Sequence, residues 1–196
     1  MHVGVAHHFG WAVLVTAAPD HSVVDRRRIE LIDAGLPTAP IHHEGGPHDM
    51  HRHGDPLDDD ALASLVARVR ASAVRVAAAA LDRLEADVAG PIASLSLRAW
   101  PADFPTDIAI QRRAPHESRA DSVMYLQVLA ELAADRDWRL HQFDAKTVEA
   151  EATRLLGARA AGVLDGPRAT LGPPWTKDHR MALAATVVAR SSSDAR

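Results

Sequence analysis

The spacing of apolar residues changes from one segment of this chain to the next, and the order of these changes constrains the fold more than any other feature. Residues 3–6 and 11–17 are short apolar runs without polar alternation, and residues 7–10 between them have turn character. Such a pattern predicts two largely buried strands in a tight antiparallel hairpin.

A third strand is predicted over residues 23–33. Ile29 and Leu31 fall on one of its faces and Arg28 and Glu30 on the other. One apolar face and one polar face are typical of a strand at the edge of a sheet.

A loop is predicted over residues 34–57, which combine Pro, Gly and histidines without an apolar period. Asp58 then supplies an N-cap to a long helix, which Gly90-Pro91 ends. The helix has apolar residues three and four apart, which form a stripe that faces the core: Leu62, Leu65, Val66, Val69, Ala73, Val76, Ala80 and Leu84.

The second half of the chain alternates strands and helices. Residues 92–97 alternate as a fourth strand, and residues 139–143 form a short fifth strand. Helical spacing covers residues from about 118 to 134, 145 to 156 and 175 to 190. We expect one α/β domain over residues 1–190, followed by a frayed tail over residues 191–196.

Composition excludes several classes of protein. The 196 residues include no cysteine, which removes disulfides, thiolate metal sites and thiol nucleophiles. The net charge of −4 gives no overall positive field, so nucleic acid would need a local basic patch. No apolar run is long enough for a membrane span and no export signal is visible, so we expect no membrane partner and a cytoplasmic protein.

The order of elements resembles the ribonuclease H-like fold, and in particular the bacterial Holliday-junction resolvases and related predicted nucleases. Four segments carry the resemblance: VGVAHHFGWAV in the first hairpin, RADSVMYLQVLAELA in the second helix, FDAKTVEAEATRLLG after the fifth strand, and WTKDHRMALA in the last helix. The resemblance spans nearly the whole chain. It implies a mixed five-stranded sheet with helices on both faces, in which the first three strands form an antiparallel meander.

The resemblance also implies a reaction, because that family cuts phosphodiesters with four carboxylates that hold two divalent metals. Most of these carboxylates are missing here. Ala6 stands at the end of the first strand, Leu97 and Arg98 at the end of the fourth, and Met181 in the last helix. Asp178 alone matches the family pattern.

Metal ligands of another kind are available. His7, His8, Asp178 and His179 are expected to converge where the first hairpin meets the last helix. Imidazoles with a carboxylate suit Zn or Mn better than Mg. The alternative is that adjacent residues of a strand point to opposite faces, so that at most one of His7 and His8 faces the site.

Three further charged residues are candidates for this site. Lys146 and Lys177 are the only lysines, and we expect both at the active-site end of the sheet as phosphate or transition-state charges. Glu117, at the start of the second helix, either replaces a missing carboxylate or compensates the helix dipole, which we favour.

Two other clusters have simpler explanations. The histidines of the loop match no closed zinc motif, so adventitious metal affinity is the better interpretation of His42, His43, His48, His51 and His53. The densest basic clusters are interpreted as solvated surface, because strand alternation divides the first of them and aromatic residues are few: Arg26, Arg27, Arg28, Arg112 and Arg113.

Two classes of function follow. The first, which we favour, is a catalytically degenerate resolvase-like protein that binds nucleic acid through local basic patches, or binds a protein partner. The alternative is a metal-dependent nuclease or phosphoesterase with a rearranged His/Asp site, with Mn, Zn or Mg as the candidate cofactor. The sequence leaves the oligomeric state open.

Overall fold

A five-stranded mixed sheet forms the centre of the protein. The structure is a computed structural model and describes residues 1–46 and 55–194. The strand order is β3-β2-β1-β4-β5. The strands are β1 (His2–His8), β2 (Trp11–Ala17), β3 (Val23–Glu30), β4 (Ser94–Arg98) and β5 (Arg139–Phe143).

Strand pairing confirms the predicted topology. β1 is central, with β2 antiparallel on one side and β4 parallel on the other. β3 continues the antiparallel meander, and β5 pairs parallel with β4. β3 ends at Glu30 rather than Asp33, and β4 begins two residues later than residue 92. The carboxyl ends of β1, β4 and β5 therefore share one edge of the sheet, called the carboxyl edge below.

Helices follow the predicted segments and add short turns between them. The long helices are α1 (Asp59–Asp87), α3 (Glu117–Ala134), α4 (Val148–Leu156) and α7 (Lys177–Asp194). α7 thus continues four residues beyond the predicted end. Segments predicted as irregular contain η1 (Ile41–Gly45), α2 (Ile108–Gln111), η2 (Gly157–Arg159), α5 (Ala160–Leu164) and α6 (Pro167–Leu171).

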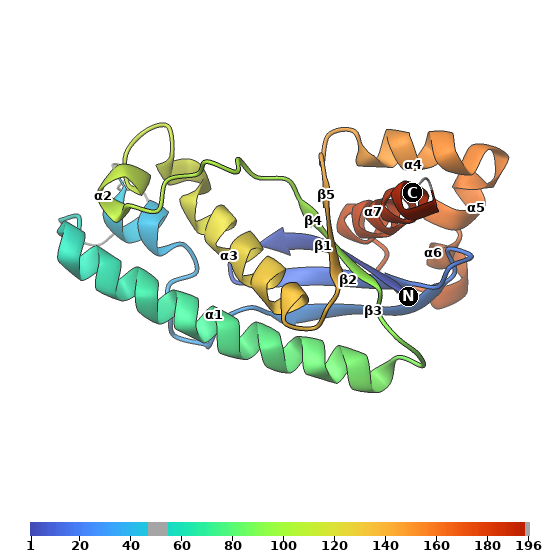
Figure 1. Cartoon of the computed structure of the whole chain (residues 1–196), viewed down its shortest axis with the longest axis horizontal. Coiled ribbons are helices and arrows are strands. Elements are labelled where there is room, and N and C mark those ends of the chain that lie inside the picture. Colours follow the sequence, from blue (N-terminus) through green and yellow to red (C-terminus); the bar gives the residue numbers. More distant parts are fainter. Residues whose placement is uncertain (47–54, 195–196) are drawn as a thin grey trace.

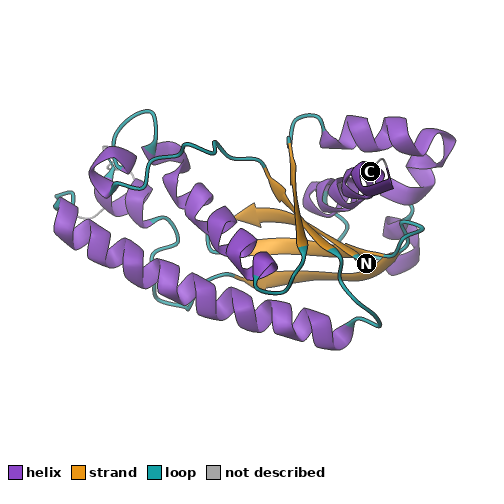
Figure 2. Cartoon of the chain, viewed as in Figure 1, coloured by secondary structure: helices purple, strands orange, loops and turns teal. Residues whose placement is uncertain are grey.

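The helices cover the two faces of the sheet (Figure 1). α1 and α3 pack on one face, where Leu62, Val69 and Leu84 join the larger core. α4 and α7 pack on the other face with Ala6 and Val13. Figure 2 shows the strands between these two helical layers. Among the described residues, no helix is both long and apolar enough to cross a membrane.

Two aspartates accept backbone N–H groups in and next to residues 34–57, the segment predicted as a loop. Asp58 accepts a hydrogen bond from the backbone N–H of Ala61 (2.8 Å), which caps α1 as predicted. Asp121 of α3 accepts the backbone N–H groups of Ile41 (3.0 Å) and His42 (2.9 Å) in η1. The buried carboxyl group of Asp121 on α3 therefore holds η1 in place, although η1 has no apolar period of its own.

α7 lies directly against the backbone of β1. A Cβ on Gly4 would lie 1.8 Å from the carbonyl oxygen of Ala182, so only glycine permits this approach. At the next strand, Ser96 Oγ donates to the carbonyl of Ala185 (3.4 Å). α7 therefore starts at the carboxyl edge and runs back across β1 and β4.

Substitution of Gly4→Ala should lower the free energy of unfolding by about 3 kcal/mol, because α7 must move away from β1 to admit the methyl group. The matched control is Gly162→Ala in α5, where an added Cβ meets no atom within 4 Å. We expect the control to stay within about 1 kcal/mol of the wild type. Urea unfolding measures both. Equal stability of the two variants would contradict the close packing.

Candidate functional site

The two adjacent histidines of β1 face opposite sides of the sheet. His7 Nε2 lies 2.7 Å from Ser122 Oγ on α3, whereas His8 Nε2 lies 3.1 Å from Asp178 Oδ2 on α7. The two side chains therefore point to opposite faces of the sheet, as the alternative interpretation expects, and His7 does not join His8 and Asp178. Strand alternation is the physical reason.

His8 and Asp178 form a pair whose geometry two neighbours fix. The His8 ring stacks on Trp11, with ring centroids 4.0 Å apart and planes 9° apart. The guanidinium of Arg28 lies 4.5 Å from the centroid of the Trp11 ring. Trp11 thus holds His8 in position for Asp178. The side chain of Asp178 is 27% exposed.

His179 does not join this pair. It is buried, and its Nδ1 lies 2.9 Å from Thr176 Oγ1 and accepts the Thr176 backbone N–H (3.2 Å). The first turn of α7 therefore uses this imidazole as a cap. In the part of the chain that the structure describes, no group of three or more His, Asp or Glu residues could hold a metal ion.

The positions at which the resolvase family carries carboxylates do not form a two-metal site. Ala6 is buried against the α4–α7 layer, and Met181 packs on the same cluster. Leu97 is buried in the core under α1 and α3, so it faces away from Asp178. Even a glutamate at position 97 would point to the wrong side of the sheet. The described residues do not fit two divalent metals, which need several carboxylate oxygens aimed at one point.

His7 is a partly buried imidazole on the α3 side. Desolvation by burial is the largest cause that lowers its pKa, to about 4, and the positive charges of Arg98 and His8 add to the effect. A neutral imidazole bonded to Ser122 adds no charge to this side of the sheet.

Both lysines lie at the carboxyl edge of the sheet. Lys146 follows β5 by three residues, and Lys177 is the first residue of α7, next to Asp178. The first turns of α4 and α7 meet at an ion pair between Arg180 and Glu149 (2.9 Å). The predicted placement at one end of the sheet therefore agrees with the backbone. Within the described ranges, neither ammonium group makes an ion pair or a hydrogen bond.

Arg26, Arg27 and Arg112 have structural partners, which corrects the interpretation of the two basic clusters as solvated surface, whereas Arg28 and Arg113 are exposed as expected. Arg26 donates to the carbonyl oxygens of Leu171 (2.7 Å) and Gly172 (2.8 Å), which fixes the segment before α7. Arg112 donates to the carbonyl oxygen of Gly45 (3.0 Å) and to the carboxylate of Asp59 (2.5 Å).

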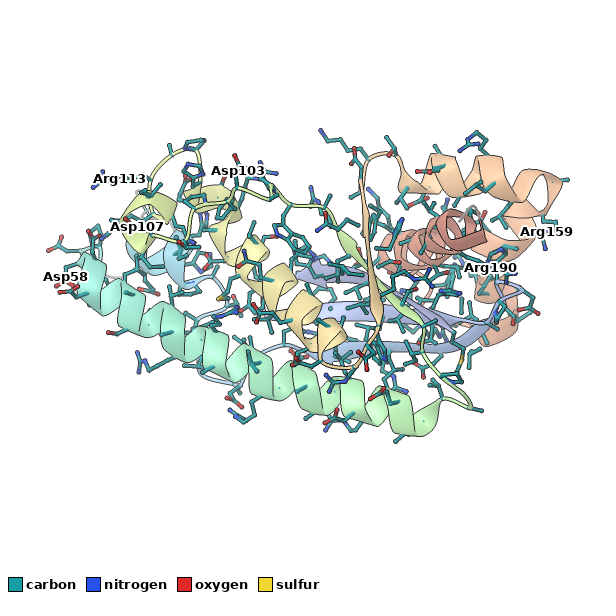
Figure 3. The ribbon with its side chains drawn as sticks, viewed as in Figure 1. Asp58, Asp103, Asp107, Arg113, Arg159 and Arg190 are labelled. Atoms are coloured by element: carbon teal, nitrogen blue, oxygen red, sulfur yellow. The ribbon has the colours of Figure 1, made fainter. Side chains whose placement is uncertain are left out.

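The other members of these clusters are also placed. Arg27 pairs with Asp25 and Asp87, and Arg28 pairs with Glu30. Arg113 lies at the α2 end of the molecule, far from Arg159 and Arg190 at the α5 end (Figure 3). These three arginines therefore do not share one surface.

The remaining candidates stay apart from Asp178. Glu117 begins α3 and is buried beside η1, on the opposite face of the sheet, so it does not replace a carboxylate of the family there. His42 and His43 belong to η1, and His48, His51 and His53 lie outside the described residues.

Sequence reasoning missed two residues of α3. Burial raises the pKa of Asp121 to about 7, although the backbone N–H groups of His42 and Ile41 oppose this shift. Ser122 was missed as the partner of His7. Their signal was present in the RADS segment, where Asp121 and Ser122 directly precede the apolar run of residues 123–126.

Comparison with known proteins shows the fold. No protein-family model matches this sequence, and no curated protein matches it. Among solved structures, a chain of T. thermophilus RuvC, described as in complex with Holliday junction substrate, is similar with a TM-score of 0.51 and 12% sequence identity. The match covers 98% of this chain and 94% of that chain. With the strand order, it confirms the ribonuclease H-like fold.

His7 should remain neutral well below the pH at which an exposed histidine is protonated. Only the unfolded chain takes the proton between pH 6.5 and about 4, so the contribution of His7 to stability is complete above pH 6.5 and is lost as the pH falls toward 4. Long-range ¹H–¹⁵N NMR, assigned with His7→Gln, measures the titration. A His7 pKa near 6.5 would contradict the burial of this ring.

Proposed function

We propose that the protein binds nucleic acid at the carboxyl edge of its sheet without two-metal cleavage. The observation that carries this proposal is a change of charge at that edge. Of the positions where the resolvase family has carboxylates, only Asp178 is acidic. The neighbouring ends of elements carry cations: Arg98 ends β4, Lys146 follows β5 and Lys177 begins α7.

The change of charge alters how phosphate would be held. In a two-metal nuclease the carboxylates bind cations, and these cations contact the phosphate. In this chain the cations are side chains, which contact a phosphate directly and need no metal. Asp144, the acidic residue that follows β5, accepts the backbone N–H of Lys146 (2.8 Å). Its carboxylate therefore has a structural partner.

Nucleic acid is favoured over a protein partner by the kind of groups at this edge. Lys146, Lys177 and Arg98 are exposed cations, and the similar resolvase chain was solved with a DNA junction. Binding through such groups depends on salt because counterions are released from the nucleic acid.

The second candidate function is a metal-dependent nuclease or phosphoesterase with a rearranged site. One contact favours it, the 3.1 Å distance between His8 Nε2 and Asp178 Oδ2, which places an imidazole and a carboxylate together. His179 is turned to Thr176, so the described residues supply two of these ligands and not three.

Labelled duplex, four-way junction and single-stranded DNA should bind equally well with Mg²⁺ and with EDTA. The double variant Lys146→Ala/Lys177→Ala should weaken binding about tenfold or more and lower the salt slope by about 2, because two phosphate contacts are lost. The matched control Arg159→Ala/Arg168→Ala removes the same charge at the α5–α6 end. Fluorescence anisotropy is the measurement. Equal loss in both double variants, or no binding, would contradict the proposal.

No Mg²⁺-dependent cleavage comparable with a resolvase is expected on junction, duplex or RNA–DNA hybrid substrates, because Asp178 alone cannot hold two dications. Gel assays with Mg²⁺, Mn²⁺ and Zn²⁺ in turn, beside Asp178→Ala, test this. Mg²⁺-dependent cleavage abolished by Asp178→Ala would overturn the proposal. Cleavage with Mn²⁺ or Zn²⁺ alone, lost in His8→Ala, would establish the rearranged enzyme instead.

A further inference from the structure

A pocket of about 260 Å³ lies at the carboxyl edge on the α3 side of the sheet, opposite the His8–Asp178 pair. Three separate segments line it. Phe9 comes from the turn between β1 and β2, Arg98 and Trp100 come from the end of β4, and Ser118, Arg119 and Ser122 come from the start of α3. We call it the arginine pocket.

We propose that the arginine pocket binds a phosphate group of a nucleic acid strand, with an adjacent base against its aromatic residues. The inference rests on the proposed function and names the part of the surface that contacts the strand. It is separate from the two lysines, which lie after β5 and at the start of α7.

Charge is the first argument. Arg98 and Arg119 line the pocket from two elements, and none of the described residues that line it is acidic. Both arginines are exposed, and in the described part of the chain neither guanidinium has an ion pair or hydrogen bond. In contrast, Arg26, Arg27 and Arg112 are held by carbonyl or carboxylate oxygens. Two cations that lack a carboxylate partner around one hollow favour an anion as the ligand.

Hydroxyl groups add directional contacts. Ser118 and Ser122 are four residues apart on α3, so they lie on the same side of the helix. The partly buried ring of His7 holds Ser122 Oγ at 2.7 Å from its Nε2 atom. Because burial keeps His7 neutral, it positions this hydroxyl without adding a charge of its own. A phosphate accepts hydrogen bonds from hydroxyl and guanidinium groups alike.

Aromatic side chains favour a nucleotide over a free anion. Phe9 is 37% exposed at the hairpin tip, so its ring is accessible to a ligand in the pocket. Trp100 lines both this pocket and a neighbouring groove of about 570 Å³ between α1 and α3. A base beside the phosphate can stack on such rings, and stacking of this kind tolerates any base sequence.

The test measures binding of a labelled ten-nucleotide single strand by anisotropy, with competition by pyrophosphate and by the same strand with or without a 5′-phosphate. Arg98→Ala and Arg119→Ala should each weaken strand binding about tenfold and lower the salt slope by about 1. Phe9→Ala should weaken strand binding about fivefold and leave competition by pyrophosphate unchanged. Arg159→Ala is the matched control and should change neither.

The outcomes separate this inference from the proposed function. If the lysine double variant loses binding while Arg98→Ala and Arg119→Ala bind as the wild type, the proposal for the arginine pocket is wrong, and nucleic-acid binding at the carboxyl edge stands on the two lysines without Arg98. If no strand binds but pyrophosphate binds and depends on Arg119, the pocket is an anion site and the nucleic-acid proposal fails. A preference for the 5′-phosphorylated strand identifies a terminal phosphate as the ligand, and equal competition identifies an internal one. If Arg159→Ala loses as much binding as Arg119→Ala, the proposal that the arginine pocket binds a phosphate is overturned.

Discussion

The contact of α7 with the backbone of β1 at Gly4 sets the geometry of the carboxyl edge. Because Gly4 has no side chain, the carbonyl of Ala182 approaches the strand closely, and the first turn of α7 then lies beside the end of β1. This approach places Asp178 Oδ2 3.1 Å from His8 Nε2, although the two residues are 170 positions apart in the sequence. If α7 packed on β1 through a layer of side chains, Asp178 would lie too far from His8 for this contact.

Alternation along β1 divides the edge into two chemically different sides. His8 joins Asp178, Trp11 and Arg28 on the α7 side, where the family would hold metal ions. His7 is partly buried on the α3 side and fixes Ser122, which lines the arginine pocket. On the first side the described residues lack the oxygen ligands for two metals. On the second, two arginines without a partner among the described residues and two serines line one pocket.

Local patterns predicted most of the fold. The apolar runs and helical stripes gave the strands and the long helices to within a few residues, and the order of the elements gave the topology. The same alternation rule gave only the alternative in which His7 and His8 diverge, whereas the expectation was that they converge. η1 was missed because its backbone is held by Asp121, a residue 80 positions from Ile41, and such a bond leaves no periodicity in the segment itself.

The site was predicted only in part for the same reason. Asp178 was identified, and its partner followed from neighbouring elements. The sequence pattern assigned Leu97 to the site, but β4 alternates so that Leu97 faces the α1–α3 core. The arginine pocket joins residue 9, residues 98–100 and the start of α3, and no local signal connects three such segments. The partners of Arg26 and Arg112 are backbone carbonyl groups far away in the sequence, which composition cannot reveal.

The most direct test of the central claim is a crystal structure of the protein with a short DNA strand grown in the presence of Mn²⁺. We expect a phosphate of the strand between Arg98 and Arg119, with no pair of metal ions beside Asp178. Two Mn²⁺ ions about 4 Å apart, coordinated by Asp178 and bound to the scissile phosphate, would contradict it.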